Sequence, residues 1–183
     1  GIISESKNLI KKYLKINVSS FRWGNWALDT KGVKLLQESG FKVDSSAVPG
    51  KKGHKNDKMS YDWSKALEHY PWKLSTIDYQ DTKHQNSNVL EIPIATFNFF
   101  GLTLRADPAN SALLSSCFDY YHKNADRSKK PFIFVVMSHS MEATHKDGSI
   151  TKVIKIMEEF LQYSRKYDDI EFLTLKNSYN LVR

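Results

Sequence analysis

Apolar runs that alternate with amphipathic stretches restrict the fold of this chain more than any other feature of its sequence. Six consecutive apolar residues, Phe132–Met137, are typical of a strand that is buried on both faces. Strands of this kind and amphipathic helices follow one another, which favours an α/β fold with a mostly parallel sheet. The predicted strands are 18–21, 41–46, 89–97, 132–137 and 170–175, and the predicted helices are 3–14, 30–40, 107–125 and 150–167.

Composition predicts a globular chain with a basic surface. The 183 residues are 40% hydrophobic, which is enough for a sizeable core. Lys and Arg outnumber Asp and Glu by 27 to 20, giving a net charge of +7, but these charges are scattered. A scattered pattern favours a solvated basic face over a nucleic-acid-binding site. No apolar run approaches the roughly 18 residues that a membrane-spanning helix needs, so we expect neither nucleic acid nor a membrane segment as a partner.

Polar residues follow three of the predicted strands at their carboxyl ends. His139 stands between two serines directly after the apolar run, Arg22 follows the first strand, and Asp44 follows "FKV" in the second extended segment. Each of them alone is compatible with a structural role in a loop or turn. Because chemistry in parallel α/β sheets collects at the carboxyl ends of the strands, their shared position predicts one site.

The connection at residues 47–88 is far longer than a usual strand-to-helix loop. It contains Trp63 and Trp72, and the remaining two tryptophans, Trp23 and Trp26, lie near Arg22. Flat aromatic faces beside polar groups can hold sugar rings, which makes the four tryptophans candidate substrate-binding residues. Aromatic residues in loops also fold inward as small satellite cores, and the sequence leaves both interpretations open.

Several segments together resemble the polysaccharide deacetylases of carbohydrate esterase family four. These segments are "FRWGNW", "DSS", "YDW", "LEIPIATF" and "SHSME", and they extend roughly over residues 19–142. The resemblance implies a partial or distorted (β/α) barrel with mostly parallel strands. It also implies hydrolysis of N- or O-acetyl groups on acetylated polysaccharide or oligosaccharide, with a divalent metal, commonly zinc.

The arginine motif of that family falls on "RWGN", residues 22–25. The resemblance implies that Arg22 positions the catalytic base and that the backbone N–H of Asn25 helps to hold the oxyanion. The sequence departs from the family pattern at two positions of this motif, where Gly24 replaces proline and Asn25 replaces tyrosine.

The histidine of "SHSME" matches the general acid of the family. The resemblance therefore implies that His139 protonates the departing amine or alkoxide, a role suited to a histidine whose charged form is stabilised by a carboxylate. The aspartate that tunes His139 is either Asp62 of "YDW" or Asp44 of "DSS", and the family pattern favours Asp62 because a tryptophan follows it.

The metal-binding motifs of the family are missing from this sequence. They precede the arginine motif, but the residues before Arg22 contain no histidine and no aspartate, only Glu5. No histidine pair has persuasive zinc-ligand spacing. We therefore expect residues 1–183 to be the carboxyl-terminal part of one deacetylase domain, with the metal held by an amino-terminal part as partner. A non-catalytic carbohydrate-binding remnant is the alternative, and a purely structural domain with Trp63 and Trp72 buried is a third.

Overall fold

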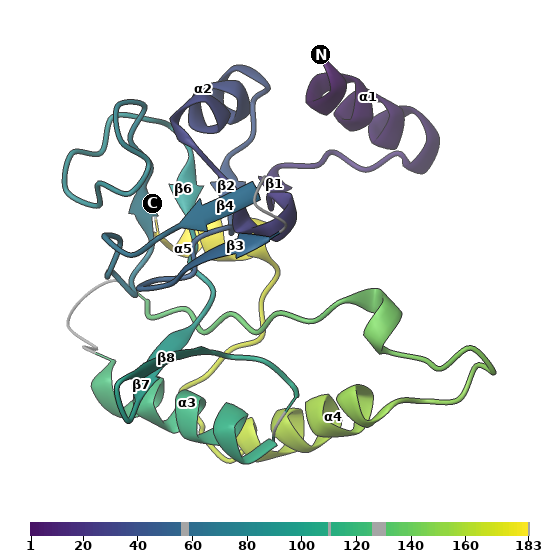
Figure 1. Cartoon of the computed structure of the whole chain (residues 1–183). Helices are drawn as coiled ribbons and strands as arrows, with labels where there is room; N and C mark the ends of the chain where they lie inside the picture. The colour runs from purple at the N-terminus through teal and green to yellow at the C-terminus, as the bar shows by residue number, and fades with distance from the viewer. Residues whose placement is uncertain (56–58, 110, 126–130, 183) are drawn as a thin grey trace. The chain divides into compact units, whose positions relative to one another are not determined.

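The computed structural model divides the chain into two compact units, residues 1–93 with 173–183 and residues 94–172 (Figure 1). It describes all residues except 56–58, 110, 126–130 and 183. The first unit contains α1 (Ile2–Leu14), β1 (Ser20–Phe21), η1 (Gly24–Trp26), α2 (Thr30–Glu38), β2 (Val43–Asp44), β3 (Lys52–Lys55), β4 (Met59–Asp62), β5 (Trp72–Lys73), β6 (Leu90–Glu91) and α5 (Leu175–Val182). The second contains β7 (Thr96–Phe99), β8 (Leu102–Arg105), α3 (Ser111–Asn124), η2 (Ser140–Glu142) and α4 (Lys152–Ser164).

A four-stranded mixed sheet organises the first unit. Its strand order is β1-β2-β6-β5, with β1, β2 and β6 parallel and β5 antiparallel to β6. The long connection contributes β5 and also the antiparallel hairpin β3–β4. The α/β class is therefore confirmed. The (β/α) barrel is not confirmed, because the strands of the described residues form this open sheet and two separate hairpins.

The register of this sheet places four side chains in one row. Phe21 lies opposite Asp44, Asp44 opposite Glu91, and Glu91 opposite Trp72. Residues directly opposite each other on neighbouring strands point to the same face of a sheet. The row therefore sets two carboxyl groups between two aromatic rings, at the carboxyl ends of β1, β2 and β6.

Helix α2 begins and ends as its sequence predicts. Asp29 caps it by accepting a hydrogen bond from the backbone N–H of Gly32 at 2.7 Å. Gly40, just beyond its end, has φ +69°, a left-handed conformation that glycine adopts without strain. Inside α2, a Cβ on Gly32 would stand 2.9 Å from the indole of Trp23, so this glycine lets the Trp23 ring approach the helix.

The predicted strand at 89–97 is interrupted at Pro93. Residues 90–91 form β6 in the first unit, whereas residues 96–99 form β7 in the second. Proline has no backbone N–H to give to a sheet ladder and therefore favours a sheet edge or a bulge. The proline instead marks the boundary between the two units.

Two other predicted strands are absent from the described residues. The segment 132–137 forms none of the named strands; Ala95 N–H donates to the Val135 carbonyl oxygen, and Met137 N–H donates to the Ala106 carbonyl oxygen. The segment 170–175 is not a strand either, and Leu175 instead begins α5. Apolar character indicated burial correctly for 132–137, which is buried or half-buried, but Phe172 and Leu173 in the other segment are exposed. In neither segment did it identify a strand partner.

An aromatic core packs α3 and α4 together in the second unit. Phe118 contacts the rings of Phe134 and Phe160 edge to face, at centroid distances of 5.2 and 5.5 Å. The helix predicted at 107–125 is described as α3 from Ser111, and Asp107 before it accepts a hydrogen bond from Ala109 N–H. Cys117 is buried in this core. Within the described residues, no helix has both the length and the apolar character needed to cross a membrane.

Replacing Gly32 by alanine tests the close approach of Trp23. The added Cβ overpacks α2 against the indole, which typically costs about 1–3 kcal/mol and outweighs the roughly 1 kcal/mol gained when a helical glycine becomes alanine. We expect a lower free energy of unfolding in urea titrations. Gly24→Ala is the control, because a Cβ there meets no atom within 4 Å; equal effects of the two changes would contradict the packing described.

Candidate functional site

Arg22 connects the ends of β1 and β2. Its Nε donates a hydrogen bond to the carbonyl oxygen of Ser45 at 2.6 Å, and its Nη2 donates one to Ser45 Oγ at 2.8 Å. The next residue, Trp23, donates its backbone N–H to Ser46 Oγ at 2.9 Å. The structure thus brings Arg22 and Asp44 to the same end of the sheet, and Ser45 and Ser46 of "DSS" link them.

Asp44 and Glu91 are completely buried side by side in the register row. Asp44 Oδ2 accepts the backbone N–H of Ser46 at 3.0 Å, and Glu91 Oε1 accepts the backbone N–H of Ala47 at 2.8 Å. Each carboxyl thereby has one oxygen bound to the segment that follows β2. Asp44 Oδ1 and Glu91 Oε2 accept no hydrogen bond from any other group in the described part of the chain.

Burial governs the protonation of this pair. It raises the pKa of Asp44 to about 6, against the opposing effects of hydrogen bonds from Glu91 and Ser46 and of the positive charge of Arg22. Burial also raises the pKa of Glu91 well above its ordinary value, and the neighbouring charge of Asp44 raises it further. Arg22 lowers the pKa of both carboxyls, but less than burial raises it.

The turn after Arg22 holds two consecutive non-glycine residues in the left-handed region. Asn25 has φ +52° and Trp26 has φ +56°, in a stretch that forms the short helix η1. Such conformations cost about 1–3 kcal/mol each and occur often at functional sites. Trp63 helps to hold this left-handed turn, because its Nε1 donates a hydrogen bond to the carbonyl oxygen of Trp26 at 3.0 Å.

The four tryptophans divide into two kinds. Trp63 and Trp72 are only 0% and 2% exposed, so neither presents a ring face to a sugar in this structure. Trp63 packs edge to face on Tyr79 at a centroid distance of 5.0 Å, as in the satellite-core interpretation. Trp23 and Trp26 are partly exposed, which leaves these two as candidate substrate contacts.

Asp62 lies at the end of β4, where Ser64 donates hydrogen bonds to its carboxylate. Its Oδ1 accepts the backbone N–H of Ser64 at 2.9 Å and Ser64 Oγ at 2.6 Å. These two hydrogen bonds lower the pKa of Asp62. Its proposed pairing with His139, a residue of the second unit, stays a prediction.

His139 is exposed and precedes the short helix η2. Its backbone N–H is bound by Glu142 Oε2 at 2.9 Å, and Ser138 Oγ donates to the same oxygen at 3.2 Å. A glutamate that reaches back to the residue before a helix is a capping-box contact. This contact explains why polar residues follow the apolar segment directly. The meeting of His139 with Arg22 stays a prediction, since the two residues belong to different units.

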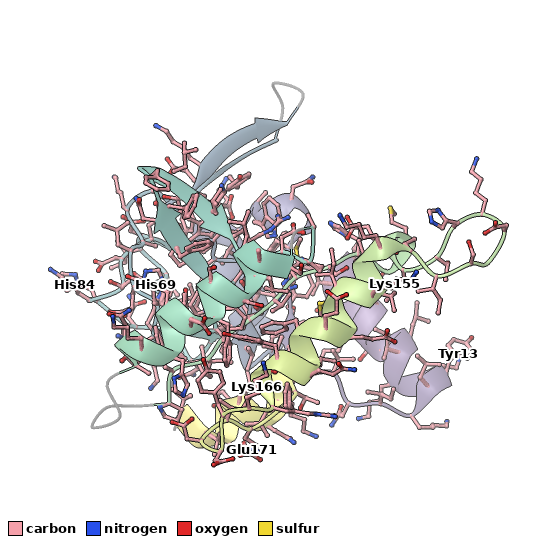
Figure 2. All side chains as sticks on the ribbon, turned by 90° about the horizontal axis from the view of Figure 1, so that it is seen from below. Tyr13, His69, His84, Lys155, Lys166 and Glu171 are labelled. Atoms are coloured by element: carbon pink, nitrogen blue, oxygen red, sulfur yellow. The ribbon has the colours of Figure 1, made fainter. Side chains whose placement is uncertain are left out.

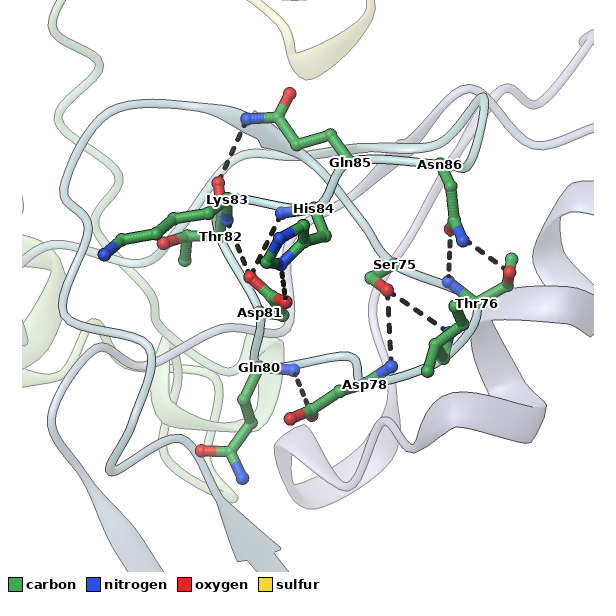
Figure 3. Close-up of polar contacts among 11 residues, drawn as sticks. Ser75, Thr76, Asp78, Gln80, Asp81, Thr82, Lys83, His84, Gln85 and Asn86 are labelled. Atoms are coloured by element: carbon green, nitrogen blue, oxygen red, sulfur yellow. Dashed lines mark hydrogen bonds and ion pairs between the residues drawn. The ribbon is translucent and has the colours of Figure 1, made fainter.

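Local hydrogen bonds organise the part of the long connection around Asp81. Asp81 Oδ2 contacts His84 Nδ1 at 2.6 Å, and Asp81 Oδ1 accepts the backbone N–H groups of Lys83 and His84 (Figure 3). These bonds, with the Lys83 N–H first, lower the pKa of Asp81 to about 2. His84 projects outward from the ribbon (Figure 2).

The described residues do not fit a divalent metal. Over the ranges that the structure describes, no three His, Cys, Asp or Glu side chains come together in a group that could hold such an ion. Asp44 and Glu91 supply carboxylates, but burial favours the protonated form of Glu91, and a metal needs its ligands deprotonated. No chemical step is assigned to a metal for these residues.

Comparisons of the chain with models of known families, with curated proteins and with solved structures find no match. Function is therefore inferred from the residues and their geometry.

Glu91 is the member of this site that sequence reasoning missed. The signal was present in "VLEIPI", where one glutamate interrupts an otherwise apolar strand. Glutamate is almost never fully buried unless it has a partner. A buried strand that carries such a residue therefore predicts a second polar group opposite it, and here that group is Asp44.

Substitutions of the two buried tryptophans by phenylalanine should have unequal effects. Trp63→Phe removes the donor to the Trp26 carbonyl oxygen, which costs about 1–3 kcal/mol in addition to the lost ring volume. Trp72→Phe removes a buried Nε1 that has no partner among the described residues, so only volume is lost. Urea unfolding should show the larger destabilisation for Trp63→Phe; the reverse order would refute the assigned hydrogen bond.

Proposed function

We propose that this chain forms part of a metal-dependent deacetylase that removes acetyl groups from acetylated polysaccharide or oligosaccharide. The observation that carries the proposal is the placement of Arg22 beside two buried carboxyls at the carboxyl ends of parallel strands. Parallel α/β sheets bind and transform ligands at this end. The resemblance of "FRWGNW", "DSS" and "SHSME" to the deacetylase motifs supplies the reaction class.

Each candidate residue has a role in this proposal. Arg22 is a positioning residue, because its guanidinium fixes the strand end at Ser45 and contributes positive charge. The backbone N–H of Asn25 faces the developing oxyanion, and the left-handed turn at Asn25 sets its direction. His139 protonates the departing amine or alkoxide, tuned by Asp62 or Asp44. The divalent metal, zinc by the resemblance, would be held by residues outside this chain.

We further propose that the open sheet belongs to a (β/α) barrel that additional strands complete. Strand β1 lies at an edge of the sheet, and unpaired sheet edges are usually covered. Helix α1, which precedes β1, exposes the apolar side chains of Ile2, Leu9 and Tyr13. Both features support an amino-terminal partner segment at this edge.

Acetate release tests the activity. The protein that contains this chain should release acetate from acetylated chito-oligosaccharides in the presence of zinc. His139→Ala should lower kcat by about 10²–10⁴-fold, the usual contribution of a general acid. His145→Ala is the matched control, because His145 is also exposed and lies six residues further along the same polar stretch; it should behave as the wild type.

Equal rates for His139→Ala and the wild type would remove His139 from the mechanism. Calorimetric binding of the same oligosaccharide with no acetate release, with or without zinc, would instead identify the non-catalytic carbohydrate-binding module. If the protein neither binds the oligosaccharide nor releases acetate, both the deacetylase and the carbohydrate-binding function are refuted.

A further inference from the structure

Two carboxyl groups that face each other in a buried row need a proton between them. Asp44 and Glu91 lie opposite each other on parallel strands β2 and β6, and both are inaccessible to water. One oxygen of each accepts a backbone N–H, from Ser46 and Ala47 respectively. The other two oxygens, Asp44 Oδ1 and Glu91 Oε2, have no donor elsewhere in the described chain. Two acceptors without a proton would repel each other at a cost that a folded protein rarely sustains.

We propose that Asp44 and Glu91 share a single proton, and that this protonated pair positions Arg22 by fixing the segment Ser45–Ala47. The carboxyl O–H of Glu91 donates to the carboxylate of Asp44, and both carboxyls accept the N–H groups that lead away from β2. The Ser45 carbonyl and hydroxyl between these anchors then hold the guanidinium. Glu91 is thus a positioning residue that acts on Arg22 through the strand end.

The charged groups around Asp44 and Glu91 are consistent with a pair that carries one proton and one negative charge. Arg22 is the cation whose charge lowers the pKa of both carboxyls, and it balances one carboxylate rather than two. Lys42, directly before β2, and Lys73 on β5 are exposed, as is Lys176 on α5. Helix α5, which packs against β2, buries Ser178 and Val182, neither of which titrates. On β5 the register partner of Glu91 is Trp72, which is uncharged.

The Asp44–Glu91 pair makes the free energy of unfolding decrease as the pH rises. The pKa of Glu91 is raised above its ordinary value of 4.5 in the folded chain. The folded chain therefore binds this proton more tightly than the unfolded chain does, and its stabilising contribution is complete only below the ordinary pKa. That contribution decreases as the pH rises through the raised pKa, because a second buried negative charge then forms beside Asp44.

Urea unfolding between about pH 5 and pH 9 tests the shared proton in the wild type and in Glu91→Gln. The glutamine amide reproduces the protonated acid permanently, since its oxygen accepts from Ala47 and its N–H donates to Asp44. We expect the wild-type midpoint to fall with rising pH, and the Glu91→Gln midpoint to fall much less. Asp44→Asn also leaves one carboxylate and should flatten the profile in the same way, which covers the case in which one variant fails to fold.

Glu38→Gln is the matched control, because Glu38 is an exposed glutamate at the end of α2; it should keep the wild-type slope. Proton exchange of Arg22 Nε–H, followed by NMR, gives the positioning readout and should accelerate with pH more steeply in the wild type than in Glu91→Gln. A wild-type midpoint that is flat or rises over this range, or a Glu91→Gln profile parallel to the wild type, would overturn the proposal. This test measures no substrate turnover, so its outcome is independent of the deacetylase proposal.

Discussion

The burial of two carboxyl groups in one row of the sheet is the constraint on which the first unit depends. Burying a single ionised carboxylate without a partner is very costly, so each carboxyl must be satisfied by a donor. Asp44 and Glu91 use the N–H groups of Ser46 and Ala47, which forces the chain to turn where β2 ends. The same turn presents Ser45 to Arg22. Strand pairing, loop conformation and the position of the cation are therefore parts of one polar network.

The two units are stabilised by different physical means. The first combines this buried polar row with tryptophans that pack inside, and Trp63 also supports the left-handed turn through the Trp26 carbonyl oxygen. The second depends on an aromatic core between α3 and α4, with the Tyr163 and Tyr167 hydroxyls both bound to Asp119. Arg22 and the acid pair belong to the first unit, and His139 belongs to the second.

Local signals predicted the helices well because capping and periodicity act over a few residues. Asp29 and Gly40 delimit α2, and Pro93 interrupts the strand that contains it. Pairing between distant segments was less predictable. The run 132–137 is buried or half-buried but forms no strand, since apolar character reports burial and not a ladder partner. For the site, strand-end position identified Arg22 and Asp44. Glu91 in "VLEIPI" indicated a buried polar partner, but the register of β2 and β6 was needed to identify that partner as Asp44.

The carboxyl carbon signals of Asp44 and Glu91, assigned by NMR and followed through neutral pH, measure the central claim most directly. A single shared proton predicts that Glu91 keeps the chemical shift of a protonated acid at neutral pH, and that mutation of Asp44 to asparagine lowers the pH at which Glu91 changes to the shift of a carboxylate. Two carboxylate shifts at neutral pH in the wild type would show that the pair is fully ionised and would contradict the account.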